Sequence, residues 1–166
     1  MADVTIEGRV IVAGEASGEL LVSTQPLSFW GGYDHQTGEI IDRRHPLSGQ
    51  IAKGRILAIP NTIGSSTTTA VLLEAVRAGT APAAILTTSI DSFLALASIV
   101  ADEMYARPIP IVALTAEQFE KLESGAKVAV RKDGTLLLTS QTRSVSSLNS
   151  GFPDLSRVRP RPARLC

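Results

Sequence analysis

The stretch from Ile56 to Thr69 constrains the fold of this chain more than any other. Four apolar residues, Ile56–Ile59, are followed by a proline, a polar turn, Gly64 and five consecutive hydroxyl residues. This pattern predicts a buried strand that passes through a turn into an amphipathic helix, Thr67–Ala78, which Gly79 ends. Strand, turn and helix in this order form the basic unit of an α/β fold.

The turn before this helix is the first candidate site. If Ser65 or Ser66 caps the helix, free backbone N–H groups and the positive end of the helix dipole lie beside two serine hydroxyls. Such a corner suits a carboxylate, a phosphate or an oxyanion. No lysine follows Gly64, so the signature of a phosphate loop is missing, and no Gly-x-Ser-x-Gly motif is present. A well-capped helix start with spare surface hydroxyls is the alternative interpretation.

The middle of the chain alternates strands and helices, and both ends are rich in strands. Strands are expected at Val4–Val12, Glu19–Ser23, Glu39–Asp42, Ala83–Thr87, Ile109–Leu114, Lys127–Arg131 and Thr135–Leu138. Further helices are expected at about 91–105 and at 116–123, and turns at Gly14–Gly18 and Lys132–Gly134. We therefore predict one α/β domain over residues 1–139, with a mixed β/β/α architecture.

Composition excludes several classes of function. Lysine plus arginine equals aspartate plus glutamate, at 16 each, and aromatic residues make up only 4% of the chain. Neither a charged surface for nucleic acid or membranes nor a stacking surface for bases is expected. The first residues do not resemble a secretion signal, and no apolar run is long enough to span a bilayer. These features predict a soluble, cytoplasmic protein.

Metal-binding residues are scarce. Cys166 is the only cysteine, and His35 and His45 are the only histidines. Zinc sites and iron–sulfur clusters need several such ligands. We therefore expect no metal site and no bound cofactor in this chain alone.

The long irregular segment from Gln25 to Gly49 holds two further candidates. Trp30 lies between Phe29 and two glycines and is either a loop anchor or, if exposed, part of a protein interface. Asp42 and His45 lie three positions apart in a loop with two arginines, which is either a solvated turn or part of a cleft. Beyond Ser140, the Ser-, Arg- and Pro-rich residues 140–166 predict a disordered tail; a basic arm that contacts a partner is the alternative.

Several short motifs resemble those of a known family, the aconitase X family, in its small swivel domain. In chain order they are Pro26–Gly32, Thr37–Asp42, His45–Gly49, Gly64–Ser66 with Val71–Glu74, and Ala81–Ile85. The resemblance covers about Val4 to Leu138. It implies a swivelling β/β/α domain that works with a larger catalytic domain, either fused or as a separate large subunit that carries an iron–sulfur cluster.

The resemblance also implies an activity. Family members are dehydratases, which act on cis-3-hydroxy-L-proline to give Δ1-pyrroline-2-carboxylate, or on mevalonate 5-phosphate. In the similar Gly-Ser-Ser turn of aconitases the first serine is the catalytic base, a role that falls on Ser65. Gly64, Ser66 and Thr67 would then bind substrate, and Asp42, His45 and Trp30 would face the cleft or the partner. This chain has Asn61-Thr62-Ile63 where glycine and arginine often precede the turn.

A serine alkoxide is a strong base, and a helix terminus stabilises it by at most about 2 kcal/mol. The rest must come from a cation and a dry site on the large partner. We therefore expect a hydro-lyase subunit that is inactive without its large subunit, most simply one that acts on a hydroxyproline. A non-enzymatic binding or regulatory module that reuses the swivel domain is the alternative from another class of function.

Overall fold

The computed structural model describes residues 3–139, and the tail expected at 140–166 lies outside them. In chain order the elements are β1 (Val4–Glu7), β2 (Arg9–Val12), β3 (Ala16–Val22), β4 (Ile56–Ala58), α1 (Ser66–Ala78), β5 (Ala84–Thr87), α2 (Ser92–Tyr105), β6 (Ile111–Ala113), α3 (Ala116–Glu120), β7 (Lys127–Val130) and β8 (Thr135–Thr139). Strands at both ends and alternating strands and helices between them confirm the predicted α/β class. Within this range no helix is long and apolar enough to cross a membrane.

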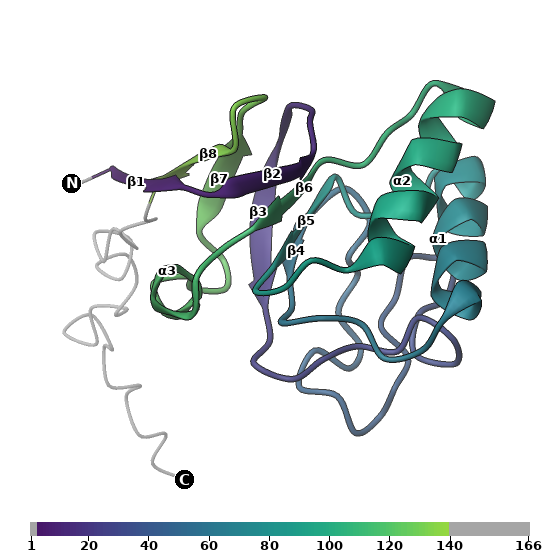
Figure 1. Ribbon diagram of the computed structural model, residues 1–166. Coiled ribbons are helices and arrows are strands. Elements are labelled where there is room, and N and C mark those ends of the chain that lie inside the picture. The colour runs from purple at the N-terminus through teal and green to yellow at the C-terminus, as the bar shows by residue number, and fades with distance from the viewer. Residues whose placement is uncertain (1–2, 140–166) are drawn as a thin grey trace, which may run out of the picture.

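A single mixed sheet curls into a nearly closed barrel. Its strand order is β1-β8-β7-β3-β4-β5-β6-β2, so β1 and β2 lie at opposite ends of the sheet. Only Gly8 separates these two strands in the chain, which forces the ends of the sheet together (Figure 1). A Cβ at Gly8 would lie 2.3 Å from Cγ1 of Val112, so a side chain does not fit at this junction. The prediction of one strand over Val4–Val12 was therefore wrong, because the chain changes partners at Gly8.

The parallel part of the sheet determines where the helices begin. β3, β4, β5 and β6 are parallel neighbours. Parallel strands need crossover connections, and here α1 connects β4 to β5 and α2 connects β5 to β6. The two helices pack side by side against one face of the sheet, and both begin at its lower edge in Figure 1. That edge is where β4 and β5 end.

Alternating side chains in these central strands feed two hydrophobic cores. Ile56 and Ala58 of β4 point into the barrel, where they join Leu20, Leu86 and Val112. Leu57 of β4 and Ile59, the first residue after this strand, point the other way, into the core beneath α1 and α2. Because all residues of β4 are buried, this strand lies between two packed layers, as its continuous apolar sequence predicted.

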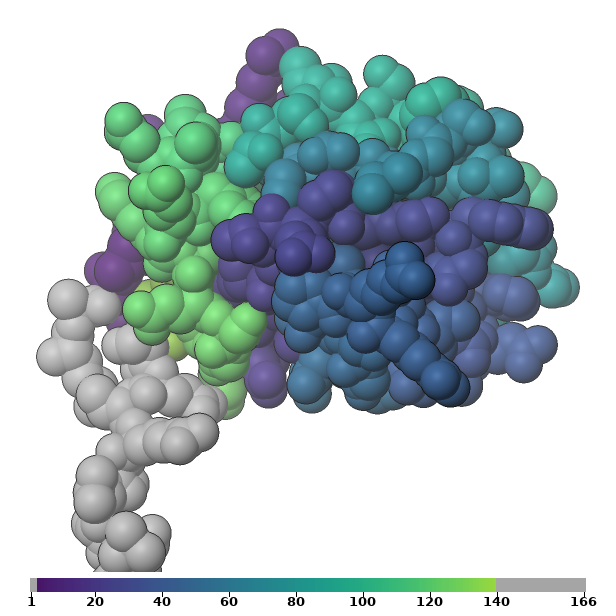
Figure 2. Space-filling view, turned by 90° about the horizontal axis from the view of Figure 1, so that it is seen from below, coloured from purple at the N-terminus to yellow at the C-terminus, as the bar shows by residue number. Residues whose placement is uncertain are grey.

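The long segment between β3 and β4 packs against the helix side of the sheet. It buries Leu27, Phe29, Tyr33 and Ile40 in the same core as α1. The Tyr33 hydroxyl donates to the carbonyl of Thr80, just after α1, at 2.7 Å, and burial raises the pKa of this phenol. Figure 2, which views the molecule from below, shows this segment in blue over much of the lower face. The strand expected at Glu39–Asp42 is reduced to isolated bridges at Glu39 and Ile40.

Local sequence signals correctly predicted most of the remaining element boundaries. Gly79 ends α1 with a positive φ of 75°, and Gly134 turns the β7–β8 hairpin with a φ of 86°. The expected turn at Gly14–Gly18 was wrong, because β3 already begins at Ala16 and pairs with β7 instead of β2. A Cβ at Gly18 would lie 2.9 Å from the carbonyl oxygen of Gly54, so this glycine allows a close approach inside a strand.

Candidate functional site

The candidate site lies at the edge of the sheet where β4 and β5 end. The loop after β4 leads into α1, and the loop after β5 leads into α2. The backbone N–H of Thr88 donates to the carbonyl of Pro60 at 3.0 Å, which joins the two loops. The amino ends of both helices are therefore neighbours at the carboxyl edge of parallel strands, where α/β proteins commonly bind ligands.

Gly64 and Ser65 form an exposed corner at the start of α1. Gly64 has a φ of +124°, a region that favours glycine. Ser65 occupies the N-cap position with φ −135° and ψ −132°, and its side chain makes no capping hydrogen bond. The expectation that Ser65 or Ser66 caps the helix was wrong. With this backbone geometry the Ser65 hydroxyl makes no hydrogen bond to the backbone N–H groups of the first turn. Within residues 3–139 the hydroxyls of Ser65 and Ser66 have no hydrogen-bond partner and face solvent.

Thr67 and Thr68 lie behind this corner. A Cβ added to Gly64 would lie 3.3 Å from the Thr68 hydroxyl oxygen and 3.5 Å from that of Thr67. Thr68 is fully buried, and its hydroxyl is the one buried side-chain polar atom without a hydrogen-bond partner in the described part of the chain. The expected binding residues Gly64, Ser66 and Thr67 therefore do lie together with Ser65 on one turn.

A cleft of about 370 Å³ opens beside Gly64, between the starts of the two helices. Its lining residues are Asn61, Thr62, Gly64, Ser89, Ile90, Asp91, Ser92 and Phe93. Among residues 3–139, Asp91 is the only charged residue in this lining, and no lysine, arginine or histidine of that range contributes to it. The cleft is thus polar and small, and it supplies no cation of its own to balance a phosphate.

Asp91 connects the two loops of the cleft. One carboxylate oxygen accepts from the backbone N–H groups of Phe93 and Leu94 at 3.0 and 3.2 Å, which caps α2. The other oxygen accepts from the backbone N–H of Thr62 at 3.1 Å and from the Thr62 hydroxyl. The sequence predicted a helix start near Asp91 but not this contact, since nothing local shows that Thr62 lies within reach.

Of the predicted site residues only Gly64 lines this cleft: Ser65, Ser66 and Thr67 follow it in the chain, and His45, Asp42 and Trp30 lie elsewhere. His45 is only 6% exposed, and its Nδ1 accepts from the backbone N–H of Leu47 at 3.2 Å. Nε2 must then carry the proton, and it donates to the carbonyl of Gln25 at 3.3 Å. His45 therefore fixes the loop that contains it. Asp42 is half-buried, and its carboxylate accepts from the backbone N–H of Arg44 at 2.9 Å.

Large apolar side chains are exposed on two parts of the surface. Trp30 is 68% exposed, as an interface residue would be. Sequence reasoning missed the outer face of α2, which exposes Phe93, Leu96, Ile99 and Met104, with Leu96 49% and Ile99 54% exposed. These residues recur every three to five positions and so follow one side of the helix. An apolar stripe of this kind on a surface helix marks an interaction face.

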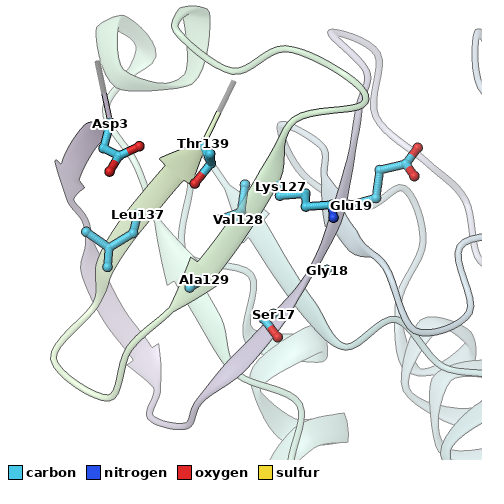
Figure 3. A pocket seen from close by; sticks show the side chains of 9 residues that line it. All are labelled: Asp3, Ser17, Gly18, Glu19, Lys127, Val128, Ala129, Leu137 and Thr139. Carbon is cyan, nitrogen blue, oxygen red and sulfur yellow. The ribbon is translucent and has the colours of Figure 1, made fainter. Parts of the chain in front are cut away.

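A second hollow, of about 490 Å³, lies on the outer surface of β3, β7 and β8 (Figure 3). It contains none of the predicted site residues. Its Asp3 lies on the opposite side from Glu19 and Lys127, so the charged groups do not converge on one point. We therefore do not treat this hollow as the active site.

The residues that the structure describes do not fit a metal cluster. Across the described residues no three histidine, cysteine, aspartate or glutamate side chains lie close enough to hold a metal ion. The single cysteine, Cys166, lies outside the described range.

Comparison with known proteins places these features in a family. The sequence profile of the "Aconitase X swivel domain" matches residues 5–138. The chain is 54% identical over 114 residues to a cis-3-hydroxy-L-proline dehydratase of Pseudomonas aeruginosa, a match that covers 69% of this chain and 20% of that protein. It is 38% identical over 129 residues to the phosphomevalonate dehydratase small subunit of Methanothermobacter thermautotrophicus, covering 77% of this chain and 94% of that subunit.

A solved structure shares the fold. The holo-form of aconitase X from Thermococcus kodakaraensis superimposes with a TM-score of 0.74 at 34% identity, over 82% of this chain and 99% of that chain. The chain thus spans about a fifth of the Pseudomonas dehydratase but nearly all of the archaeal small subunit.

Because the Ser65 hydroxyl caps nothing, we predict that Ser65→Ala changes the free energy of unfolding of this chain by less than about 0.5 kcal/mol. Thr115→Ala is the matched control, since the Thr115 hydroxyl accepts from the backbone N–H of Gln118 in a capping box at the start of α3. That variant should lose about 1 kcal/mol. Chemical denaturation checks both values, and an equal loss for the two variants would show that Ser65 does cap α1.

Proposed function

This chain belongs to the aconitase X family as a swivel domain, and we propose that it is the small subunit of a dehydratase that removes water from a hydroxy acid. The observation that carries this proposal is the exposed Gly64-Ser65-Ser66 turn, which offers unpaired hydroxyls at a helix start beside a polar cleft. The matches to dehydratases and to a dehydratase small subunit support the same reaction class.

The proposed substrate is cis-3-hydroxy-L-proline. The 54% identity to a dehydratase of that name exceeds the 38% identity to a phosphomevalonate dehydratase small subunit. The described residues also line the cleft with one carboxylate and no cation, which is unfavourable for a phosphate. Mevalonate 5-phosphate is the second candidate, because the archaeal small subunit has nearly the same extent as this domain.

Ser65 would act as the base. It would accept the proton from the ring carbon that bears the carboxylate, and the electrons of that C–H bond would form the double bond to the neighbouring carbon. The hydroxyl on that neighbour takes up a proton, which an acid on the large subunit would supply, and leaves as water; the resulting enamine tautomerises to Δ1-pyrroline-2-carboxylate, and the proton on Ser65 returns to solvent. The amino end of α1 lies beside the negative charge on the serine oxygen and favours it by at most about 2 kcal/mol. This is too little to make an alkoxide available near neutral pH.

A large catalytic subunit would supply what this chain lacks. We propose that it carries the iron–sulfur cluster, which would assist departure of the hydroxyl, and that it excludes water from the Ser65 corner. The apolar face of α2 supports a partner at this position, since Phe93 both belongs to that face and lines the cleft. A subunit that covers the cleft would therefore also cover α2.

The first test is turnover by the reconstituted pair of subunits. Ser65→Ala should lower kcat at least ~10²-fold, the usual range for an acid–base group, with a smaller effect on KM. Ser66→Ala is the matched control and should affect KM more than kcat. The reconstituted pair is assayed in parallel with each hydroxyproline isomer and with mevalonate 5-phosphate as substrate.

Near wild-type turnover by Ser65→Ala would refute the role of Ser65 as the base. A wild-type pair that dehydrates none of these compounds would favour the alternative of a non-enzymatic binding module.

The second test concerns the interface. Leu96→Glu places a charge in the middle of the apolar face of α2, and burying that charge against a partner is costly. It should abolish co-purification with the large subunit, while Val4→Glu, at an exposed position on β1, should not. Trp30→Ala should weaken the complex if the loop around Trp30 also contacts the partner. Intact binding by Leu96→Glu, checked by circular dichroism for folding, would exclude α2 from the interface.

A further inference from the structure

The Gly64-Ser65-Ser66 corner is held to the start of α2 on both of its sides. Before the corner, Thr62 donates its backbone N–H and its hydroxyl to one oxygen of Asp91. After it, the Thr69 hydroxyl donates to the carbonyl of Phe93 at 3.0 Å. Between these two contacts the corner itself is exposed, with only a 2.9 Å bond from the Thr68 N–H to the Ser65 carbonyl.

The contact at Asp91 is the stronger of the two. Its carboxylate accepts four hydrogen bonds, two from the first turn of α2 and two from Thr62. This fills the acceptor positions of both oxygens. Hydrogen bonds to a charged acceptor are about twice as strong as those between neutral groups. Asp91 is therefore not free to bind substrate, although it lines the cleft.

The remaining contacts of this loop fix its first half. The Ile63 N–H donates to the carbonyl of Leu27 at 3.0 Å, and Pro60 accepts from Thr88 at 3.0 Å. Gly64, with no side chain and a positive φ, comes directly after this fixed part. Because Gly64 has no side chain to anchor it, the position of Ser65 depends on how firmly the preceding residues are held, and Thr62 contributes to this through Asp91.

We propose that Asp91 is a positioning residue for the reaction: through Thr62 it holds the Gly64–Ser65 corner, so that the Ser65 oxygen meets the substrate in one geometry. This inference rests on the proposed function, in which Ser65 is the base. It assigns to Asp91 a role beyond capping α2. Misplacing a reacting group by about 1 Å can cost up to ~10²-fold in rate, so a loosened corner should lower kcat.

The decisive variant is Asp91→Asn. Asparagine still caps a helix well, but its amide NH₂ cannot accept from Thr62 while its oxygen caps α2. We expect kcat of the reconstituted enzyme to fall about tenfold, with KM within about twofold of wild type. Thr62→Val, which removes only the hydroxyl, should lower kcat less. The double variant should be no slower than Asp91→Asn alone, because both changes remove the same contact.

Asp133→Asn is the matched control. Its carboxylate likewise accepts from a backbone N–H, that of Thr135 at 2.9 Å, but in the β7–β8 hairpin. This variant should leave kcat unchanged.

A second measurement does not depend on the partner or on activity. In the free full-length chain, backbone NMR order parameters of Ser65 and Ser66 should fall in Asp91→Asn and in Thr62→Val, and stay unchanged in Asp133→Asn. Unchanged order parameters together with wild-type kcat in both site variants would overturn the proposal. If the wild-type pair itself shows no dehydratase activity, the proposed function fails, whereas a fall in the order parameters would still establish the clamp.

Discussion

The burial of β4 and β5 on both faces is the constraint on which the rest of this structure depends. Because they are parallel neighbours, each must be followed by a crossover, and α1 and α2 pack on the same side. Both helices consequently begin at the same edge. The candidate base at Ser65 and the carboxylate of Asp91 are neighbours only through this topology, although 26 positions separate them in the sequence.

The same arrangement explains why the proposed site needs a partner. The corner offers a hydroxyl, a helix terminus and a polar cleft, but the described residues bring no cation to it. Meanwhile α2 keeps an apolar face in solvent next to the cleft, at a cost that a lone domain would avoid. A half-site bordered by an unpartnered apolar helix is the arrangement expected of a domain that closes onto a larger protein.

Sequence reasoning succeeded where the determinants are local. The apolar run of β4, the glycine that ends α1 and the glycine of the β7–β8 hairpin each carry their own signal. Sequence reasoning failed where the local structure depends on residues that are distant in the chain. Gly8 breaks the first strand only because the barrel must close there, and the cap expected at Ser65 is lost to the backbone geometry after Gly64. The contact between Asp91 and Thr62 required knowing that two loops meet.

The central claim is that the Ser65 corner forms part of an active site completed by the large subunit. A structure of the reconstituted complex with cis-3-hydroxy-L-proline bound tests it most directly. The account predicts the Ser65 oxygen at roughly 3–3.5 Å from the carbon that bears the carboxylate, with the apolar face of α2 buried against the partner. A complex in which Ser65 faces solvent, away from the bound substrate, would contradict it.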